Sequence, residues 1–106
     1  MPRCFDLSGR VAVVVGGTSG IGQAIAQGLE QHGAHVIAAG RSSEQYPVDV
    51  TSRQSLEQLR DKVGRVDILI NAAGQTFRQP TIDVIELAWT KLIDISLTGM
   101  LRAAQV

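Results

Sequence analysis

Short apolar runs alternate with helical patterns along the whole chain. Four segments are predicted as strands: residues 11–15, 35–39, 46–50 and 66–70. Three segments carry apolar residues every three or four positions and are predicted as helices: about 21–32, 52–63 and 84–106. This alternation predicts an α/β fold, a Rossmann-like open parallel sheet with strand order 3-2-1-4 and helices on both faces.

Two details of the first two helices are specific enough to check. In the first helix, Ile21, Ile25 and Leu29 recur at four-residue spacing, which places them on one stripe that we expect to be buried. At the start of the second, Thr51 followed by Gln54 fits a capping box, in which each side chain bonds the backbone of the other.

The last helical pattern runs from about Val84 to the final residue, Val106, with a broad apolar face. Trp89 on this helix is expected to be a core or interface anchor. A broad apolar face also makes a homo-oligomer through this helix plausible. Because no stop signal ends the pattern, we expect the chain to be a truncated or incompletely covered piece of a longer protein.

The composition of the chain limits which binding partners and which cellular location we expect. The chain has 106 residues, enough for one small domain, and its ten Lys and Arg balance its ten Asp and Glu. That balance gives no electrostatic argument for binding nucleic acid or a membrane surface. No apolar run is long enough for a membrane span. Cys4 is the only cysteine, so no disulfide can form within the chain, and a cytoplasmic location is expected.

A glycine-rich turn follows the first predicted strand and opens the first helix. We expect Gly16 to permit the tight turn, Gly20 to let a pyrophosphate approach the backbone, and Gly22 to let the helix pack closely. The free N–H groups and the positive end of the helix dipole favour phosphate there. The alternative is a strand-to-helix turn that binds nothing.

Four motifs in order give the chain its resemblance to a known family. They are Gly16-Gly17-Thr18-Ser19-Gly20-Ile21-Gly22, Asp49-Val50, Asn71-Ala72-Ala73-Gly74 and the segment from Asp94 to Gly99. They resemble the T-G-x-x-x-G-I-G turn, the adenine-contacting pair, the N-N-A-G segment and the x-x-N-L-x-G stretch of the short-chain dehydrogenase/reductase family. The resemblance covers the whole chain, although family members are more than twice as long.

The resemblance implies the N-terminal dinucleotide-binding half, residues 1–106, of an oxidoreductase. Such an enzyme moves hydride between a nicotinamide cofactor and a carbonyl or alcohol substrate. The residues that it implies for cofactor binding are Gly16, Thr18, Ser19, Gly20, Ile21, Gly22, Asp49, Val50, Asn71, Ala72, Ala73 and Gly74. For Asp49, an equally simple reading is a loop aspartate that precedes the second helix.

The chain departs from the family pattern at several positions. Val15 replaces the threonine of the first motif, Ala72 replaces the second asparagine of N-N-A-G, and Ser96 stands at the asparagine of the catalytic tetrad. The family's catalytic serine and its Y-x-x-x-K pair lie beyond this chain. The only tyrosine, Tyr46, is followed four residues later by Val50 rather than lysine, so no catalytic acid or base is predicted within these residues.

The end of the second predicted strand bears on the choice of nucleotide. An acidic residue there would accept hydrogen bonds from the adenosine 2′-OH and repel a 2′-phosphate. Here the position is Gly40, followed by Arg41 and Ser42, which can donate hydrogen bonds to a phosphate. We therefore favour NADP(H) over NAD(H), with a solvated surface arginine as the alternative.

Two hypotheses of different class follow from these residues. The first is an NADP(H)-dependent short-chain oxidoreductase whose catalytic Ser and Tyr-x-x-x-Lys are absent from this chain. The second is a catalytically silent nucleotide-binding fragment or interaction module. No metal site is expected, because His32 and His35 have no cysteine or paired carboxylate to complete one.

Overall fold

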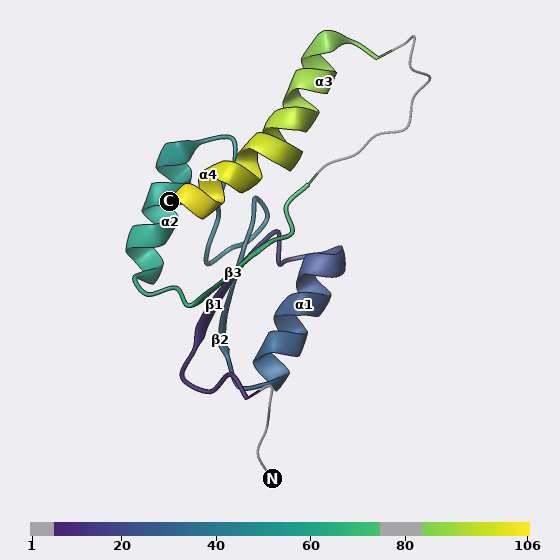
Figure 1. Cartoon of the computed structure of the whole chain (residues 1–106). Coiled ribbons are helices and arrows are strands. Elements are labelled where there is room, and N and C mark those ends of the chain that lie inside the picture. Colours follow the sequence, from purple (N-terminus) through teal and green to yellow (C-terminus); the bar gives the residue numbers. More distant parts are fainter. Residues whose placement is uncertain (1–5, 75–83) are drawn as a thin grey trace.

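A parallel sheet of three strands in the order β2-β1-β3 forms the centre of the computed structural model, which describes residues 6–74 and 84–106 (Figure 1). The strands are β1 (Val11–Val15), β2 (His35–Ala39) and β3 (Ile68–Asn71). Val11 pairs with His35, and Ala12 pairs with Ile68. The predicted α/β class and the parallel sheet are therefore confirmed.

The two faces of β1 are buried by different layers of the molecule. Ala12 and Val14 are fully buried on one face. On the other face, Val13 and Val15 belong to the main hydrophobic core. Figure 1 shows α1 (Gly20–Gln31) on one side of the sheet, with α2 (Arg53–Val63) and α4 (Gly99–Gln105) on the other. A strand covered on both faces needs the continuous apolar run that β1 has.

The segment predicted as the strand 46–50 forms only an isolated parallel bridge, between Gly40 and Pro47. Its place beside β2 agrees with the expected order, but no ladder extends along it. Pro47 has no N–H to donate to a neighbouring strand, which limits pairing at this edge. Val48 and Val50 are nevertheless buried in the main core, so the segment still covers the sheet.

The predicted features of α1 and α2 need two corrections. Ile21 is not on a buried stripe, since it is 80% exposed at the first turn of α1, whereas Gly22 and Ala26 are buried. The capping box also does not form. Ser52 is the N-cap of α2, and its side chain accepts a hydrogen bond from the backbone N–H of Ser55.

The helix predicted as continuous from Val84 is divided into α3 (Glu86–Ile93), a π-helical turn (Asp94–Thr98) and α4. α4 packs against α2 and β3, whereas α3 projects away from the sheet (Figure 1). Trp89 on α3 is 55% exposed, so it is not a core residue of this chain.

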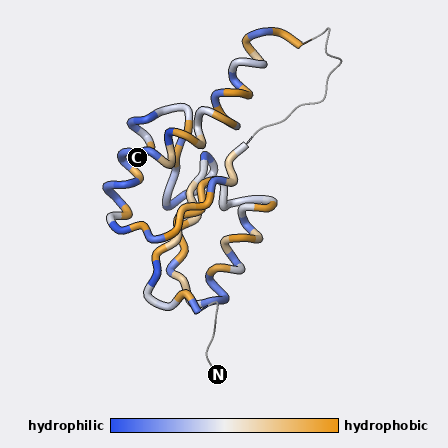
Figure 2. The backbone as a smooth tube through the Cα atoms, viewed as in Figure 1, coloured by the Kyte–Doolittle hydropathy of each residue, from blue (hydrophilic) through white to orange (hydrophobic). Residues whose placement is uncertain are grey.

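Apolar side chains remain exposed on the C-terminal helices. Figure 2 shows hydrophobic positions along α3 as well as in the central strands. The exposed large residues of this region are Ile85, Leu87, Trp89, Leu97, Met100 and Leu101. Within the described residues, no helix is both long and apolar enough to cross a membrane.

Candidate functional site: a cavity at the carboxyl ends of the strands

A cavity of about 220 Å³ opens where β1 and β2 end. Its lining comes from the glycine turn, from the loop after β2, from the segment after β3 and from the π turn. The lining residues are Val15, Gly16, Thr18, Ser19, Gly40, Arg41, Ser42, Val48, Asp49, Val50, Ala73, Gly74 and Ile95. Ligands of open α/β sheets bind at this edge, outside the carboxyl ends of the strands.

Close backbone contacts fix the glycine turn against its neighbours. Gly16 has a φ of 86°, and a Cβ built on it would lie 2.6 Å from the backbone nitrogen of Ala73. A Cβ on Gly22 would lie 2.0 Å from the carbonyl oxygen of Gly16 and 3.1 Å from the Ala72 side chain. The tight turn expected at Gly16 is present, and Gly22 allows α1 to start directly against the turn.

Gly20 has a different environment from these two glycines. Its φ is 58°, and a Cβ built on it would meet nothing within 4 Å. Its backbone is thus open on the side that a ligand would approach. Ser19 is the N-cap of α1 but makes no side-chain capping hydrogen bond. The first-turn N–H groups, which have no acceptor within the helix, are therefore available to an anion.

Three polar side chains, one from the glycine turn and two from the loop after β2, lie at this cavity. Arg41 and Ser42 are the two that were expected beside a phosphate. The Thr18 Oγ1 and Ser42 Oγ atoms lie 3.3 Å apart, and Arg41 lines the same cavity with an exposed side chain. A Cβ on Gly40 would lie 3.3 Å from Thr18 Oγ1. A larger side chain at Gly40 would therefore crowd this group.

Asp49 lines the same cavity and is held by its own loop. Its Oδ1 accepts hydrogen bonds from the Thr51 hydroxyl at 2.6 Å and from the Thr51 N–H at 2.9 Å. These bonds lower the pKa of Asp49 below its ordinary value, and the positive charges of Arg41 and Arg102 act in the same direction. The carboxylate therefore stays ionised at neutral pH.

The π turn reaches the cavity from the C-terminal helix. Ile95, within this turn, is buried and lines the cavity. Ser96 follows it, and a Cβ built on Gly74 would lie 3.9 Å from the Ser96 hydroxyl. The departure from α-helical geometry thus falls at the residue that replaces the expected asparagine. Such π turns are frequent at functional sites.

Most of the residues predicted for the site meet at this one cavity. The predicted residues among its lining are Gly16, Thr18, Ser19, Arg41, Ser42, Asp49, Val50, Ala73 and Gly74. Gly22 and Ala72 lie beneath the turn, Gly20 and Ile21 lie on the first turn of α1, and Asn71 ends β3.

Sequence reasoning missed the lining residue Val48, which the alternating pattern that it shares with the predicted Val50 could have indicated. Val48 and Val50 alternate with exposed residues, so both point to the core side of their segment. Ile95 carried no such signal, because its position depends on the π turn. Among the described residues, no three His, Cys, Asp or Glu side chains gather in a way that could hold a metal ion.

Comparison with known proteins decides the family. Residues 10–106 match the family model described as short chain dehydrogenase. The chain belongs to the short-chain dehydrogenase family. The match begins one residue before β1 and includes the glycine turn, the loop after β2 and the π turn.

Curated relatives resemble the chain over most of its length. An uncharacterised oxidoreductase of Staphylococcus aureus is 36% identical over 118 aligned residues, which cover 93% of this chain and 51% of that protein. An uncharacterised oxidoreductase of Staphylococcus haemolyticus is 34% identical, with 91% and 50% covered. The chain thus spans about half the length of the curated relatives it matches.

Solved structures agree with this assignment. The NADP active-site complex of RhlG from Pseudomonas aeruginosa superimposes with a TM-score of 0.89 at 32% identity, over 99% of this chain and 49% of that one. The ligand-free aldohexose dehydrogenase of Thermoplasma acidophilum gives a TM-score of 0.81 at 26% identity, over 95% and 44%. Membership of the short-chain dehydrogenase family implies a nicotinamide cofactor.

Proposed function

We propose that residues 1–106 form the cofactor-binding half of an NADP(H)-dependent short-chain oxidoreductase. The choice of NADP(H) rests on one observation, a cluster of polar side chains beside Gly40 that comes from Thr18, Arg41 and Ser42. A 2′-phosphate placed there would meet one guanidinium and two hydroxyl groups, and no carboxylate at position 40 would repel it. The NADP complex of the related RhlG is consistent with this cofactor.

The residues of this chain divide the binding work between them. The first turn of α1, with Gly20 at its start, would bind the pyrophosphate through backbone N–H groups. Asp49 and Val50 would border the adenine, and the 71–74 segment would lie toward the nicotinamide. When bound, the reduced nicotinamide would give hydride to a carbonyl, and the oxidised form would accept it from an alcohol.

Proton transfer is the part of the reaction that these residues do not supply. In the family it belongs to the serine and the Tyr-x-x-x-Lys pair, which lie outside this chain. Ser96 has a shorter side chain than the asparagine of the family tetrad. It would therefore hold the water of the proton relay less closely on the nicotinamide side of the site. The alternative, a catalytically silent nucleotide-binding module, predicts the same binding with no hydride transfer in the native protein.

Calorimetric titration with NADPH and NADH tests the cofactor assignment. We expect NADPH to bind more tightly, and Arg41→Asp to weaken NADPH by about tenfold or more while leaving NADH within about twofold. Gly40→Asp should shift the preference in the same direction. Arg60→Asp is the matched control, because it changes the net charge equally at an exposed arginine outside the cavity. Equal binding of the two nucleotides, or no effect of Arg41→Asp, would refute the assignment.

We also propose a homo-oligomer through the C-terminal helices and a location in the cytoplasm. The exposed Leu87, Trp89 and Leu97 side chains support the oligomer, since large exposed apolar patches commonly mark interfaces. Light scattering on the native protein and on Trp89→Glu checks this proposal. A monomeric native protein would contradict it.

A further inference from the structure

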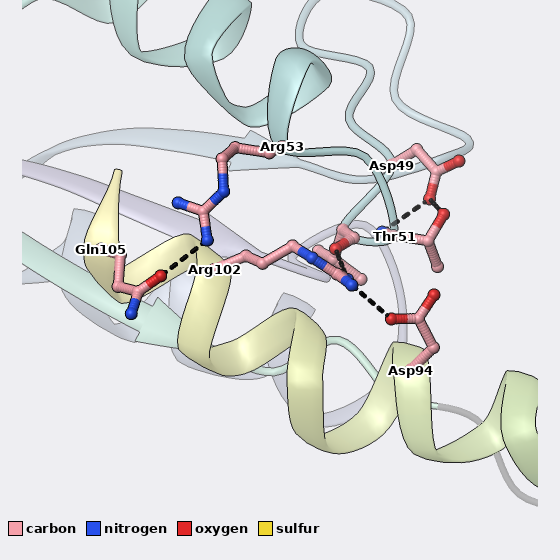
Figure 3. A network of polar contacts seen from close by, with 7 residues as sticks. Asp49, Thr51, Arg53, Asp94, Arg102 and Gln105 are labelled. Atoms are coloured by element: carbon pink, nitrogen blue, oxygen red, sulfur yellow. Dashed lines mark hydrogen bonds and ion pairs between the residues drawn. The ribbon is translucent and has the colours of Figure 1, made fainter.

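Arg102 joins the C-terminal helix to the loop that borders the adenine end of the cavity. Its Nη1 donates a hydrogen bond to the carbonyl oxygen of Val50 at 3.0 Å, and its Nη2 lies 2.7 Å from Asp94 Oδ1 (Figure 3). The Arg102 side chain is only 21% exposed. One guanidinium therefore bridges the π turn and the 49–51 loop in a partly desolvated position, where such bonds are stronger than at an open surface.

Asp94 begins the π turn, and Arg102 lies eight residues later in α4. In a regular α-helix, two residues eight apart are turned from each other by about 80° around the axis, although both still lie on one broad face. The π turn accommodates one extra residue, which brings Asp94 and Arg102 closer to direct alignment. The ion pair thus spans the same wide turn that carries Ser96.

A second contact ties the same loop to the same helix. Val50 is buried, and a Cβ built on Gly99 would lie 2.7 Å from Val50 Cγ2 and 3.1 Å from the carbonyl oxygen of Asp94. Gly99 thus lets the helix approach Val50 closely, while Arg102 bonds the Val50 carbonyl. Packing and hydrogen bonding from one helix together fix the position of Val50.

The position of Val50 in turn sets the position of Asp49. The Asp49 carboxylate bonds the Thr51 hydroxyl and N–H, and the Ser52 N–H donates to the Asp49 carbonyl at 3.0 Å. These internal bonds make a compact turn, and the Asp49 N–H also donates to the Ser55 hydroxyl at 2.9 Å, which joins the turn to the start of α2. Within the described chain, the side-chain hydrogen bond that joins this turn to the C-terminal helix is the one from Arg102.

We infer that Arg102 is a positioning residue, which couples the π turn to the adenine half of the nucleotide site through the Val50 carbonyl. This inference rests on the proposed function, because it assigns the 49–51 loop to the adenine. Arg102 itself does not line the cavity, so it acts on a nucleotide only through this loop.

Arg102→Met tests the inference, and Arg53→Met is the matched control. Arg53 Nη2 donates to Gln105 Oε1 at 2.7 Å between α2 and α4, so the control removes an exposed arginine hydrogen bond to the same C-terminal helix without touching Val50 (Figure 3). We expect Arg102→Met to weaken adenosine 2′,5′-bisphosphate binding by about fivefold, the effect of losing one hydrogen bond of about 1 kcal/mol. Arg53→Met should stay within about twofold.

Amide hydrogen exchange supplies a readout that needs no nucleotide. In Arg102→Met, protection of the Thr51 and Ser52 amides should fall by about fivefold or more, while the Ala72 amide, which bonds Val15 in the sheet, keeps its protection. A purely structural role would lower the global stability and the protection of all three amides together. Arg102→Lys should recover part of the effect, since one ammonium can still bond one acceptor.

The outcomes separate the two proposals. Unchanged affinity and unchanged Thr51 and Ser52 exchange in Arg102→Met would overturn the role of Arg102, even if NADPH binds as proposed. If the unaltered chain binds neither nucleotide, the proposed function fails and the adenine coupling fails with it, whatever the exchange result. If Arg102→Met does not fold, Asp94→Asn replaces it and should show the same pattern in weaker form.

Discussion

Two glycines of the same helix should respond in opposite directions to alanine. Gly22 and Gly28 both lie in α1, and neither has a positive φ. A Cβ on Gly22 would lie 2.0 Å from the Gly16 carbonyl oxygen and 2.8 Å from the Gly16 carbonyl carbon, whereas a Cβ on Gly28 would meet nothing within 4 Å. A comparison of Gly22→Ala with Gly28→Ala therefore separates the effect of helix propensity from the effect of close packing at the glycine turn.

The magnitudes follow from these distances. Gly28→Ala should stabilise the protein by about 0.5–1 kcal/mol, because alanine favours the helix and restricts the unfolded chain. Gly22→Ala makes the same gain in helix propensity, but its Cβ would lie more than 1 Å inside contact distance of the Gly16 backbone, so the backbone must move. Overpacking of this kind costs about 1–3 kcal/mol. The two variants should thus differ by about 1–3 kcal/mol, with Gly22→Ala less stable than the unaltered chain.

Urea unfolding followed by circular dichroism measures this difference. For a domain of this size, 1 kcal/mol corresponds to roughly 4–8 °C in melting temperature, so thermal melts give an independent check. The slope of the unfolding free energy against urea should stay constant in both variants. Equal stability of Gly22→Ala and Gly28→Ala would refute the packing assigned to the glycine turn.

Three further changes test separate parts of the fold. Ser52→Ala should lower the free energy of unfolding by about 1 kcal/mol, because it removes the N-cap of α2. Gln54→Ala should change the free energy of unfolding by less than about 0.5 kcal/mol, and urea unfolding measures both effects. Gly99→Ala should destabilise by about 1–3 kcal/mol, because its Cβ would press on Val50; no loss of stability would contradict that contact. The Val11 N–H donates to Asp67 Oδ2 at 2.8 Å, and this hydrogen bond lowers the pKa of Asp67. The unaltered chain should therefore be more stable than Asp67→Asn above about pH 4. This difference in stability should vanish as the pH falls through the lowered pKa of Asp67. A pH-independent difference between Asp67→Asn and the unaltered chain would contradict this linkage.

Periodicity and motif spacing predicted the layers of the fold and most of the residues that line the cavity at the strand ends. The strands β1 and β2 were predicted at their observed bounds, because a continuous apolar run followed by glycine has few other readings in an α/β chain. The Gly16 and Gly22 roles were also predictable, since a strand that turns directly into a helix leaves no room for side chains there.

The predictions from the sequence failed where tertiary contacts override the local pattern of residues. Ile21 fits the apolar stripe of α1, but its side chain is 80% exposed, because the first turn packs against the glycine turn through Gly22 instead. Ser52 instead of Thr51 caps α2, because the Thr51 hydroxyl already bonds Asp49. The π turn at Asp94–Thr98 leaves no sign in hydrophobic spacing, because it adds only one residue to an otherwise helical pattern.

The most direct test of the nucleotide site is a map of the binding surface. Amide chemical shifts of the isotopically labelled chain, recorded during titration with NADPH, report which backbone groups contact the ligand. We predict saturable shifts confined to the 16–22 turn, to Arg41 and Ser42, to the 49–51 loop and to the 71–74 segment, with α3 unaffected. No saturable shifts, or shifts that cluster on α3 instead of the glycine turn, would contradict the account.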